Sequence, residues 1–333
     1  APRRGRGLLL ALGGAVLFIG LATVFVELLR PLAPSHAAAQ TGDVPRRALP
    51  PEAKVKAKDA AAAGTLRPPI AQVPVTDIDK PEIDETRLAA GATPPARAAV
   101  PAAPIPAGPI VAIVLTELGP NATAAKTAID RLPAAVSLAF SPYADASRDL
   151  AKAAKAGGHE VWLSVPMQPK SYPRVNPGKN VLLTGEAPAE NVRRLDWALS
   201  RVEAPVGVTN MMGSAFTENA AAMRPVLDAV KAKRLFYVDA RSSGRSVGET
   251  EARAIGLAAA TNDRFLDEPE TAANIRSNLD ALVATAKRRG YAVGYARPVS
   301  TTIGEIERWS AELEAKGVTL VGASLVARKA SND

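Results

Sequence analysis

The residues of this chain that could do chemistry stand at the ends of predicted strands. Two of them, Glu117 and Asp239, are carboxylates and are the candidates for a catalytic acid or base. The other candidates would bind a ligand: Tyr143, Ser164, Asn210, Met211, Arg241 and Arg297. Because the carboxyl ends of parallel strands meet at one edge of a sheet, we expect these side chains to surround a common mouth.

This set lacks the side chains that hold a catalytic divalent metal. Such a metal needs several lone-pair donors and an open position for water, and neutral imidazole is the usual donor for zinc. The chain has no cysteine and two histidines, His36 and His159, and we expect His159 to be structural because it precedes a strand. Met211 offers a soft thioether and Arg297 has no lone pair, so we predict no metal and no other cofactor.

The elements that would position these residues begin at Ile110, where short apolar runs start to alternate with amphipathic stretches. The predicted strands are 110–115, 136–140, 160–165, 206–209, 235–239, 258–261, 291–295 and 318–321. The predicted helices are 122–131, 145–156, 189–201, 218–233, 247–254, 272–289 and 302–316, the last with a capping box at Thr302 and Glu305. This alternation predicts an α/β fold with a mostly parallel sheet, closed or nearly closed as an irregular β/α barrel. An open doubly wound sheet is the alternative.

The N-terminal third is of a different kind. Residues 8–26 carry no charge and are preceded by Arg3, Arg4 and Arg6, so we predict a transmembrane helix over about 8–29 with a cytoplasmic N-terminus. A cleaved signal peptide is the alternative, although its apolar region is usually about 7 to 15 residues. The Ala- and Pro-rich residues 31–107 cannot bury enough apolar surface to fold and are predicted to be a disordered linker. The predicted organisation is therefore an anchor (1–30), the linker, a domain (108–327) and a tail (328–333).

This organisation predicts a single-pass protein of the inner membrane whose C-terminal domain lies in the periplasm. The formal charge of +8 is spread along the chain, and no basic cluster is interleaved with aromatic residues. We therefore do not expect a nucleic-acid partner.

Several short segments of the domain occur together in one known family. They are Leu118-Gly119, Ala139-Phe140-Ser141-Pro142-Tyr143, Gly158-His159-Glu160-Val161, Val165-Pro166-Met167, Asn210-x-Met212-Gly213-Ser214 and Asp239-x-Arg241. On these segments, from about Pro109 to Arg308, the chain resembles the divergent polysaccharide deacetylase family, relatives of the NodB-type carbohydrate esterases. The resemblance implies an irregular β/α barrel and, in the family, a divalent metal that assists removal of acetyl groups from amino sugars.

The chain departs from this family at the residues that would hold the metal. The acidic pair after the first strand is Thr116-Glu117, and the three expected histidines are replaced by Ser164, Met211 and Arg297. The resemblance thus implies that the metal is lost and that Arg297 has taken its place.

Several candidates also have a structural interpretation. Glu117 would cap a helix or pair with Arg297, and Asp239 with Arg241 would form a network at a strand end. Met211 would fill the core. Tyr143, together with Trp162 and Tyr172, would either stack against a sugar or, for Trp162, belong to the core.

Three functions remain open at this stage. The first is a membrane-anchored, catalytically degenerate deacetylase-like protein that binds a glycan or an envelope protein. The second is an active deacetylase with a rearranged site at Glu117, Asp239 and Asn210. The third is a tethered envelope scaffold, in which the anchor and linker hold a docked domain.

Overall fold

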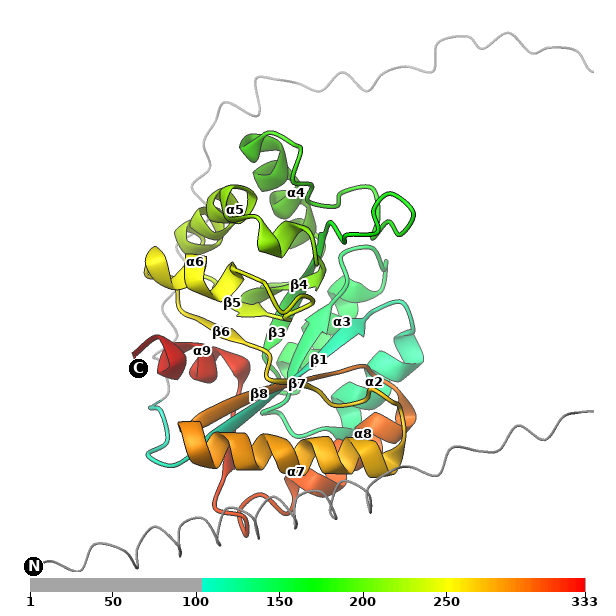
Figure 1. Ribbon diagram of the computed structural model, residues 1–333. Coiled ribbons are helices and arrows are strands. Elements are labelled where there is room, and N and C mark those ends of the chain that lie inside the picture. Colours follow the sequence, from blue (N-terminus) through cyan, green and yellow to red (C-terminus); the bar gives the residue numbers. More distant parts are fainter. Residues whose placement is uncertain (1–103, 333) are drawn as a thin grey trace, which may run out of the picture. The chain divides into compact units, whose positions relative to one another are not determined.

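A computed structural model describes residues 104–332, which form a curled parallel sheet with helices packed around it (Figure 1). The strands are β1 (Ile110–Leu118), β2 (Ser137–Phe140), β3 (Val161–Met167), β4 (Gly207–Met212), β5 (Phe236–Asp239), β6 (Ala259–Thr261), β7 (Arg264–Phe265), β8 (Tyr291–Ala296) and β9 (Thr319–Leu320). They pair in the order β6-β5-β4-β3-β2-β1-β8-β7, with β9 beside β1, and the pairings are parallel. The predicted α/β fold with a mostly parallel sheet is confirmed, and the sheet is a curled half-barrel.

The helices follow the strands nearly as predicted. They are α2 (Ala122–Arg131), α3 (Ser147–Ala156), α4 (Pro188–Ser200), α5 (Ala220–Ala232), α6 (Gly248–Ala254), α7 (Ala272–Arg289), α8 (Ser300–Ser310) and α9 (Ala323–Asn332), with a 3₁₀ turn, η2, at Phe216–Glu218. The predicted capping box at Thr302 is wrong, because α8 begins two residues earlier, after the extended backbone of Val299, and has no side-chain cap. No helix of residues 104–332 is long and apolar enough to cross a membrane, and the predicted anchor over 8–29 and the linker up to 103 lie outside the described residues.

The two faces of the sheet are packed differently. Val111, Ile113 and Leu115 of β1 belong to an outer cluster of buried residues beneath the surrounding helices. Ile110, Ala112 and Val114, which alternate with them, belong to an inner cluster on the concave face. This inner cluster includes Trp162 of β3 and Tyr295 of β8, with relative exposures of 0% and 1%.

Helix α9 covers this concave face. Its buried residues, Ala323, Val326, Ala327 and Ala330, are spaced i, i+3, i+4 and i+7, so one apolar stripe packs on the inner cluster. The residues expected as a tail from 328 therefore continue this helix to Asn332.

The carboxylate of Glu160, at the amino end of the sheet, forms hydrogen bonds with the start of α9. It accepts hydrogen bonds from Ser137 Oγ (3.0 Å), Trp162 Nε1 (3.1 Å) and the backbone N–H of Ser324 (3.1 Å), and also from the Ser324 hydroxyl. Ser137 Oγ in turn accepts the N–H of Ala323 at 2.9 Å. A negative charge near the first turn of a helix also interacts favourably with the helix dipole, so Glu160 fixes α9 in place.

The two edges of the curled sheet are joined by a very short crossing. Only Asn262 and Asp263 separate β6 from β7. The N–H of Asn262 donates to the Asp239 carbonyl (2.8 Å), and that of Asp263 donates to the Val293 carbonyl (2.8 Å). The chain thus passes from beside β5 to beside β8 within two residues.

Candidate functional site

The carboxyl ends of the strands place some candidate residues on the concave face and others on the outer face. Thr209 faces inward, because its hydroxyl is 2.7 Å from the hydroxyl of Tyr295, a residue of the inner cluster. Met211, two residues further along β4, shares this face. Ser164 is paired in register with Thr209 and alternates with outward-facing Leu163 and Val165, so it also faces inward.

Ser164 is a buried hydroxyl without a partner. Its relative exposure is 2%, and its Oγ has no hydrogen-bond partner within the described residues. At the next layer of the concave face Pro166 is paired with half-buried Met211, and the following residue, Met212, is 44% exposed. The concave wall at β3 and β4 therefore offers the unpartnered hydroxyl of Ser164 and the thioether of Met211.

Arg297 follows β8 and is held by carboxylates of the preceding segment. Its backbone N–H donates to Oδ2 of Asp267 at 2.8 Å, and its Nη2 lies 3.9 Å from the carboxylate of Glu270. Its Nε lies 3.4 Å from Asp267 Oδ2, near enough for charge attraction but not aligned as a hydrogen bond. Asp267 is only 2% exposed, so this guanidinium compensates a buried carboxylate.

The expected pairing of Glu117 with Arg297 is not found. Glu117 lies at an irregularity of β1, where the register shifts so that Leu118 pairs with Phe140, and its φ of 61° is left-handed. The side chain is exposed and forms no hydrogen bond or ion pair with any residue of the described range. The partner that sequence reasoning missed is Asp267, since the two-residue strand before it gave no recognisable signal.

Asp239 faces away from the concave side, because Val238 before it belongs to the inner cluster. Its Oδ1 accepts the backbone N–H of Arg241 at 2.7 Å and its Oδ2 accepts the Ser246 hydroxyl at 2.5 Å. Burial raises the pKa of Asp239 above its usual value of 3.8, while these two hydrogen bonds oppose the rise. The residue orders the segment after β5.

Asn210 also lies on the outer face, two residues after Val208 of the outer cluster. Its Oδ1 accepts the N–H of Ala240 (2.9 Å), and its Nδ2 donates to the Met212 carbonyl (2.7 Å) and to Ser242 Oγ (3.1 Å). The amide is therefore fully used in joining the ends of β4 and β5.

Tyr143 is held under the segment between β3 and α4. Its hydroxyl accepts the N–H of Asn180 (3.1 Å), and its ring packs on Trp197 with centroids 5.3 Å apart. Gly178 covers the ring so closely that a Cβ there would lie 2.2 Å from Cζ of Tyr143. Burial raises the pKa of this tyrosine above 10.0. The half-buried ring is thus packed against Gly178 and Trp197, and Trp162 belongs to the inner cluster.

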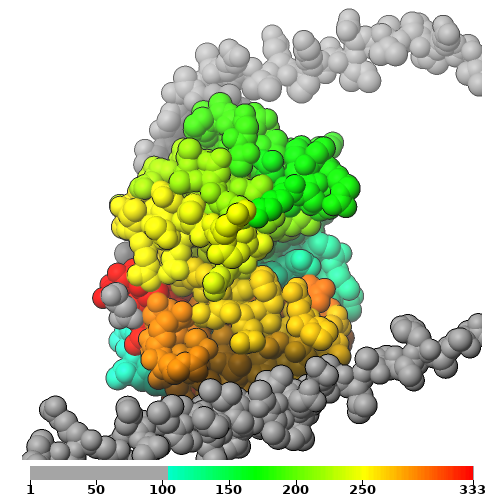
Figure 2. Space-filling view, viewed as in Figure 1, coloured from blue at the N-terminus to red at the C-terminus, as the bar shows by residue number. Residues whose placement is uncertain are grey.

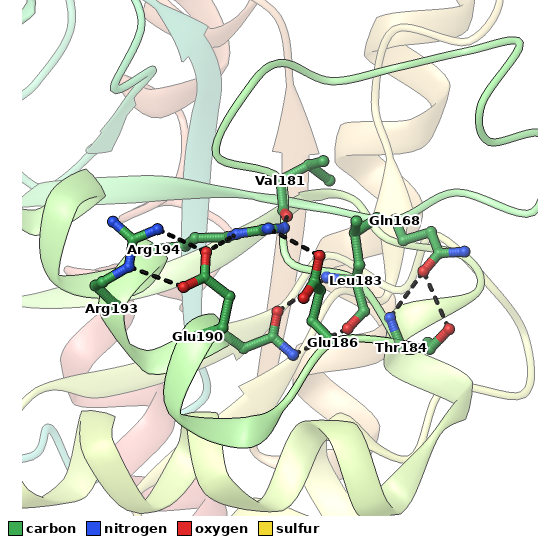
Figure 3. Close-up of polar contacts among 9 residues, drawn as sticks. Gln168, Val181, Leu183, Thr184, Glu186, Glu190, Arg193 and Arg194 are labelled. Carbon is green, nitrogen blue, oxygen red and sulfur yellow. Dashed lines mark hydrogen bonds and ion pairs between the residues drawn. The ribbon is translucent and has the colours of Figure 1, made fainter.

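The segment between β3 and α4 forms an ordered rim (Figure 3). Arg194 donates to the Val181 carbonyl (2.6 Å) and pairs with Glu186 (3.0 Å) and Glu190 (2.7 Å), while Gln168 Oε1 accepts from the N–H and the hydroxyl of Thr184. Hydrogen bonds from Arg193 and Arg194 lower the pKa of Glu190 to about 2.

His159 contacts two backbone carbonyls, Nδ1 to Val136 (2.9 Å) and Nε2 to Ile129 (3.2 Å), and is 5% exposed. It ties helix α2 to the start of β2 and lies in the structural position expected for it.

The donor set at the mouth does not fit a divalent metal. Within residues 104–332, no group of three His, Cys, Asp or Glu side chains could hold one. The positions that the resemblance assigns to metal-binding histidines hold an unpartnered hydroxyl at Ser164, a thioether at Met211 and the guanidinium of Arg297. A fixed positive charge repels a cation, so these three residues do not form a divalent-metal site.

Arg241 leads instead to a cleft of about 410 Å³ beside the crossing between β6 and β7. The side chain is exposed, and its backbone has a left-handed φ of 54°. The cleft is lined by Arg241, Gly244, Asn262, Asp263, Arg264, Phe265, Glu268 and Asn278.

The chain is similar to one protein family, to two bacterial proteins and to a solved structure. The family described as divergent polysaccharide deacetylase matches residues 113–327. The Escherichia coli K12 protein YibQ is 29% identical over 193 residues, which are 58% of this chain and 60% of that protein. A protein of Haemophilus influenzae Rd is 29% identical over 197 residues, 59% of this chain and 69% of the relative. The crystal structure of ATU2773 from Agrobacterium tumefaciens C58 superposes with a TM-score of 0.64 at 33% identity, over 66% of this chain and 89% of that one.

Proposed function

Because the chain belongs to the divergent polysaccharide deacetylase family, we propose that it binds a carbohydrate polymer of the cell envelope and no longer removes acetyl groups from it. The observation that supports this proposal is the pairing of Arg297 with buried Asp267. The family resemblance assigns a metal-binding histidine to this position, and the guanidinium there supplies positive charge without a lone pair. The carboxylate that could have been a metal ligand is neutralised by its own neighbour.

The remaining chemistry of the mouth is that of a binding surface. Hydroxyl and guanidinium groups beside apolar side chains are typical of a site that binds a ligand. The proposed ligand is a glycan of the envelope. The second proposed partner is a protein of the envelope. In this proposal the chain is anchored in the inner membrane by residues 8–29, and the linker lets the domain search the periplasm.

An active deacetylase with a rearranged site receives less support. Asp239 and Asn210 use their polar atoms on Ser246, Ser242 and nearby backbone groups. Glu117 forms no hydrogen bond to either within the described residues. Catalysis requires the acid, the base and the substrate-positioning group to reach the same reacting part of the substrate. These three side chains do not converge in that way.

The test combines metal content, acetate release and binding in the full chain purified in detergent. We expect no stoichiometric zinc, manganese or cobalt, no acetate from chitotetraose in the presence of these ions, and measurable calorimetric binding of chitotetraose. Release of acetate by the wild-type chain would overturn the proposal, and loss of that release in Glu117→Gln would establish the rearranged site. The triple variant Ser164→His, Met211→His and Arg297→His is the matched comparison, because it returns three imidazoles to the mouth.

A deletion of the linker distinguishes the scaffold function from glycan binding. Ile105 packs on the inner cluster, so the part of the predicted linker that can be deleted without touching the domain ends at residue 103. Removal of residues 31–103 with the anchor retained shortens the reach of the domain and leaves its glycan affinity unchanged under our proposal. If the deletion abolishes a cellular phenotype while glycan affinity is zero in both forms, the protein acts as a scaffold.

A further inference from the structure

The cleft beside the β6–β7 crossing has the composition of a second, charged part of the binding surface. It lies where the segment after β5 faces β7 and the first half of α7, on the side of the molecule shown in Figure 2 by yellow and orange-yellow atoms. Two of its lining residues are arginines, Arg241 and Arg264, and one is an exposed phenylalanine, Phe265. The inference below rests on the proposed glycan-binding function and specifies the class of glycan.

Arg264 is oriented before any ligand arrives. Its Nη1 donates to Asn278 Oδ1 at 3.1 Å, and Asn278 is itself fixed because its Nδ2 donates to the Leu266 carbonyl at 3.0 Å. The backbone N–H of Arg264 donates to Asn262 Oδ1 at 3.0 Å. Holding one nitrogen of the guanidinium in this way leaves its other donors free, and it reduces the entropy lost when they bind an anion.

Arg241 is held in an unusual backbone conformation by a buried carboxylate. Its φ of 54° is left-handed, a conformation that costs free energy for a residue with a Cβ and persists only where the surroundings impose it. Asp239 Oδ1 accepts its N–H at 2.7 Å, and Asp239 is only 1% exposed. Asp239 is thus a positioning residue that turns Arg241 toward the cleft.

The charge of these two arginines is not compensated by the protein in the way that other arginines are. Arg194, Arg276 and Arg289 each pair with a carboxylate. Within residues 104–332, neither Arg241 nor Arg264 forms an ion pair.

Two carboxylates line the same cleft, and only one of them has a partner within the protein. Asp263 is already occupied, since its Oδ2 pairs with Arg289 at 2.6 Å and accepts the N–H of Val293 at 2.8 Å. Glu268 is exposed and forms no hydrogen bond or ion pair with the described part of the chain. The cleft therefore has two uncompensated cations and one uncompensated carboxylate.

Phe265 supplies an apolar wall beside these charges. It is 37% exposed, and its ring is held edge-on to Tyr295 with centroids 6.3 Å apart. An aromatic ring presented next to hydrogen-bonding groups suits the face of a pyranose ring, which is apolar on one side and bears hydroxyls at its rim.

We propose that this cleft binds an acidic sugar unit, with its carboxylate between Arg241 and Arg264 and its ring against Phe265. Guanidinium groups bind a carboxylate through paired, charge-assisted hydrogen bonds, which are stronger than those between neutral groups. The ligand class is accordingly a polysaccharide with carboxylate-bearing units, and a neutral polymer of the same backbone is bound more weakly.

The test compares two tetrasaccharides that share their backbone. One alternates N-acetylglucosamine with N-acetylmuramic acid, which bears a carboxylate, and the other is chitotetraose, which bears none. By calorimetry at fixed ionic strength we expect the full chain to bind the acidic tetrasaccharide about tenfold more tightly. Arg264→Gln and Arg241→Gln should each remove most of this difference, while Arg288→Gln, an exposed arginine of α7 outside the cleft, should preserve it.

A further variant acts in the opposite direction and guards against loss by misfolding. Glu268→Gln removes the uncompensated carboxylate, so it should tighten binding of the acidic tetrasaccharide and leave chitotetraose unchanged. Equal affinity for both tetrasaccharides, or a preference that survives both arginine substitutions, would overturn the acidic-sugar assignment alone. If the protein binds neither of the two tetrasaccharides, the proposed glycan-binding function is overturned.

Discussion

The two ends of the parallel sheet use charge in opposite ways. At the amino end, the carboxylate of Glu160 accepts hydrogen bonds from three residues and fixes α9 on the concave face. At the carboxyl end, Arg241 and Arg264 line an open cleft without a carboxylate partner in the described range. At the amino end the carboxylate is used within the protein to fix a helix, whereas at the carboxyl end two guanidinium groups lack a carboxylate partner among the described residues.

The largest expected effect is at the amino end. Glu160→Gln replaces an acceptor-only group by an amide whose NH₂ faces the donors of Trp162 and Ser324, so we expect a loss of about 3 kcal/mol in the free energy of unfolding. Urea denaturation followed by circular dichroism measures it. Glu314→Gln, at an exposed position, is the control and should change this free energy by less than about 0.5 kcal/mol. Equal effects of the two substitutions would contradict the role of Glu160.

The next effect concerns the pair at the mouth. Asp267→Asn removes the charge that Arg297 compensates and turns a donor toward it, so we expect a loss of about 2 kcal/mol in unfolding free energy. Glu270→Gln, whose carboxylate is 43% exposed and 3.9 Å from the same guanidinium, should cost less than about 0.5 kcal/mol. If the two variants have the same denaturation midpoint, the buried position of Asp267 is not what matters.

A smaller effect is expected at Asp239, and it depends on pH. Because burial raises the folded-state pKa of Asp239 above 3.8, its protonated form is favoured by folding, and this contribution to stability is lost as pH rises through the raised pKa. Asp239→Asn should therefore change stability at neutral pH by less than about 1 kcal/mol and flatten the dependence of melting temperature on pH above 3.8. An unchanged slope in differential scanning calorimetry would refute this.

The smallest effect is confined to the carboxyl group of Glu218, at the end of η2. Hydrogen bonds from Lys170, Ser243 and Arg245 lower the pKa of Glu218 from 4.5 to about 2, so its stabilising contacts are present above pH 4.5 and are lost as pH falls toward 2. Lys170→Met should raise this pKa, as measured by carbon NMR of the glutamate carboxyl, whereas Lys152→Met, on the exposed side of α3, should not. Identical titration curves in the two variants would show that Lys170 does not contact Glu218 in solution.

The regular part of the fold could be predicted from local pattern. The bounds of α2 and α7 agree with the prediction at both ends, because apolar periodicity defined them. By contrast, β7 has two residues and no periodicity to detect, so Asp267 after it could not be recognised as a strand-end residue. Helix α9 had a detectable stripe at Ala323, Val326, Ala327 and Ala330, which its position after a weak strand obscured.

The sequence predicted which residues lie at the strand ends. It did not predict toward which face of the sheet their side chains point. Strand alternation depends on register, and the irregularity in β1 sends Glu117 to solvent with a left-handed backbone. The outward orientation of Asp239 and Asn210 depends likewise on which neighbours are inside the curled sheet. Tyr143 contacts Gly178 and Trp197, which are distant in sequence and reach it only in the folded domain.

The position of α9 also determines when the domain can finish folding. The first strand pairs with β8 and β9, nearly the whole domain away in sequence, and the inner cluster is covered only by the last described helix. Contacts between such distant segments form slowly, since a long loop must close before they contribute. We therefore expect the concave core to be shielded from water only after α9 has formed.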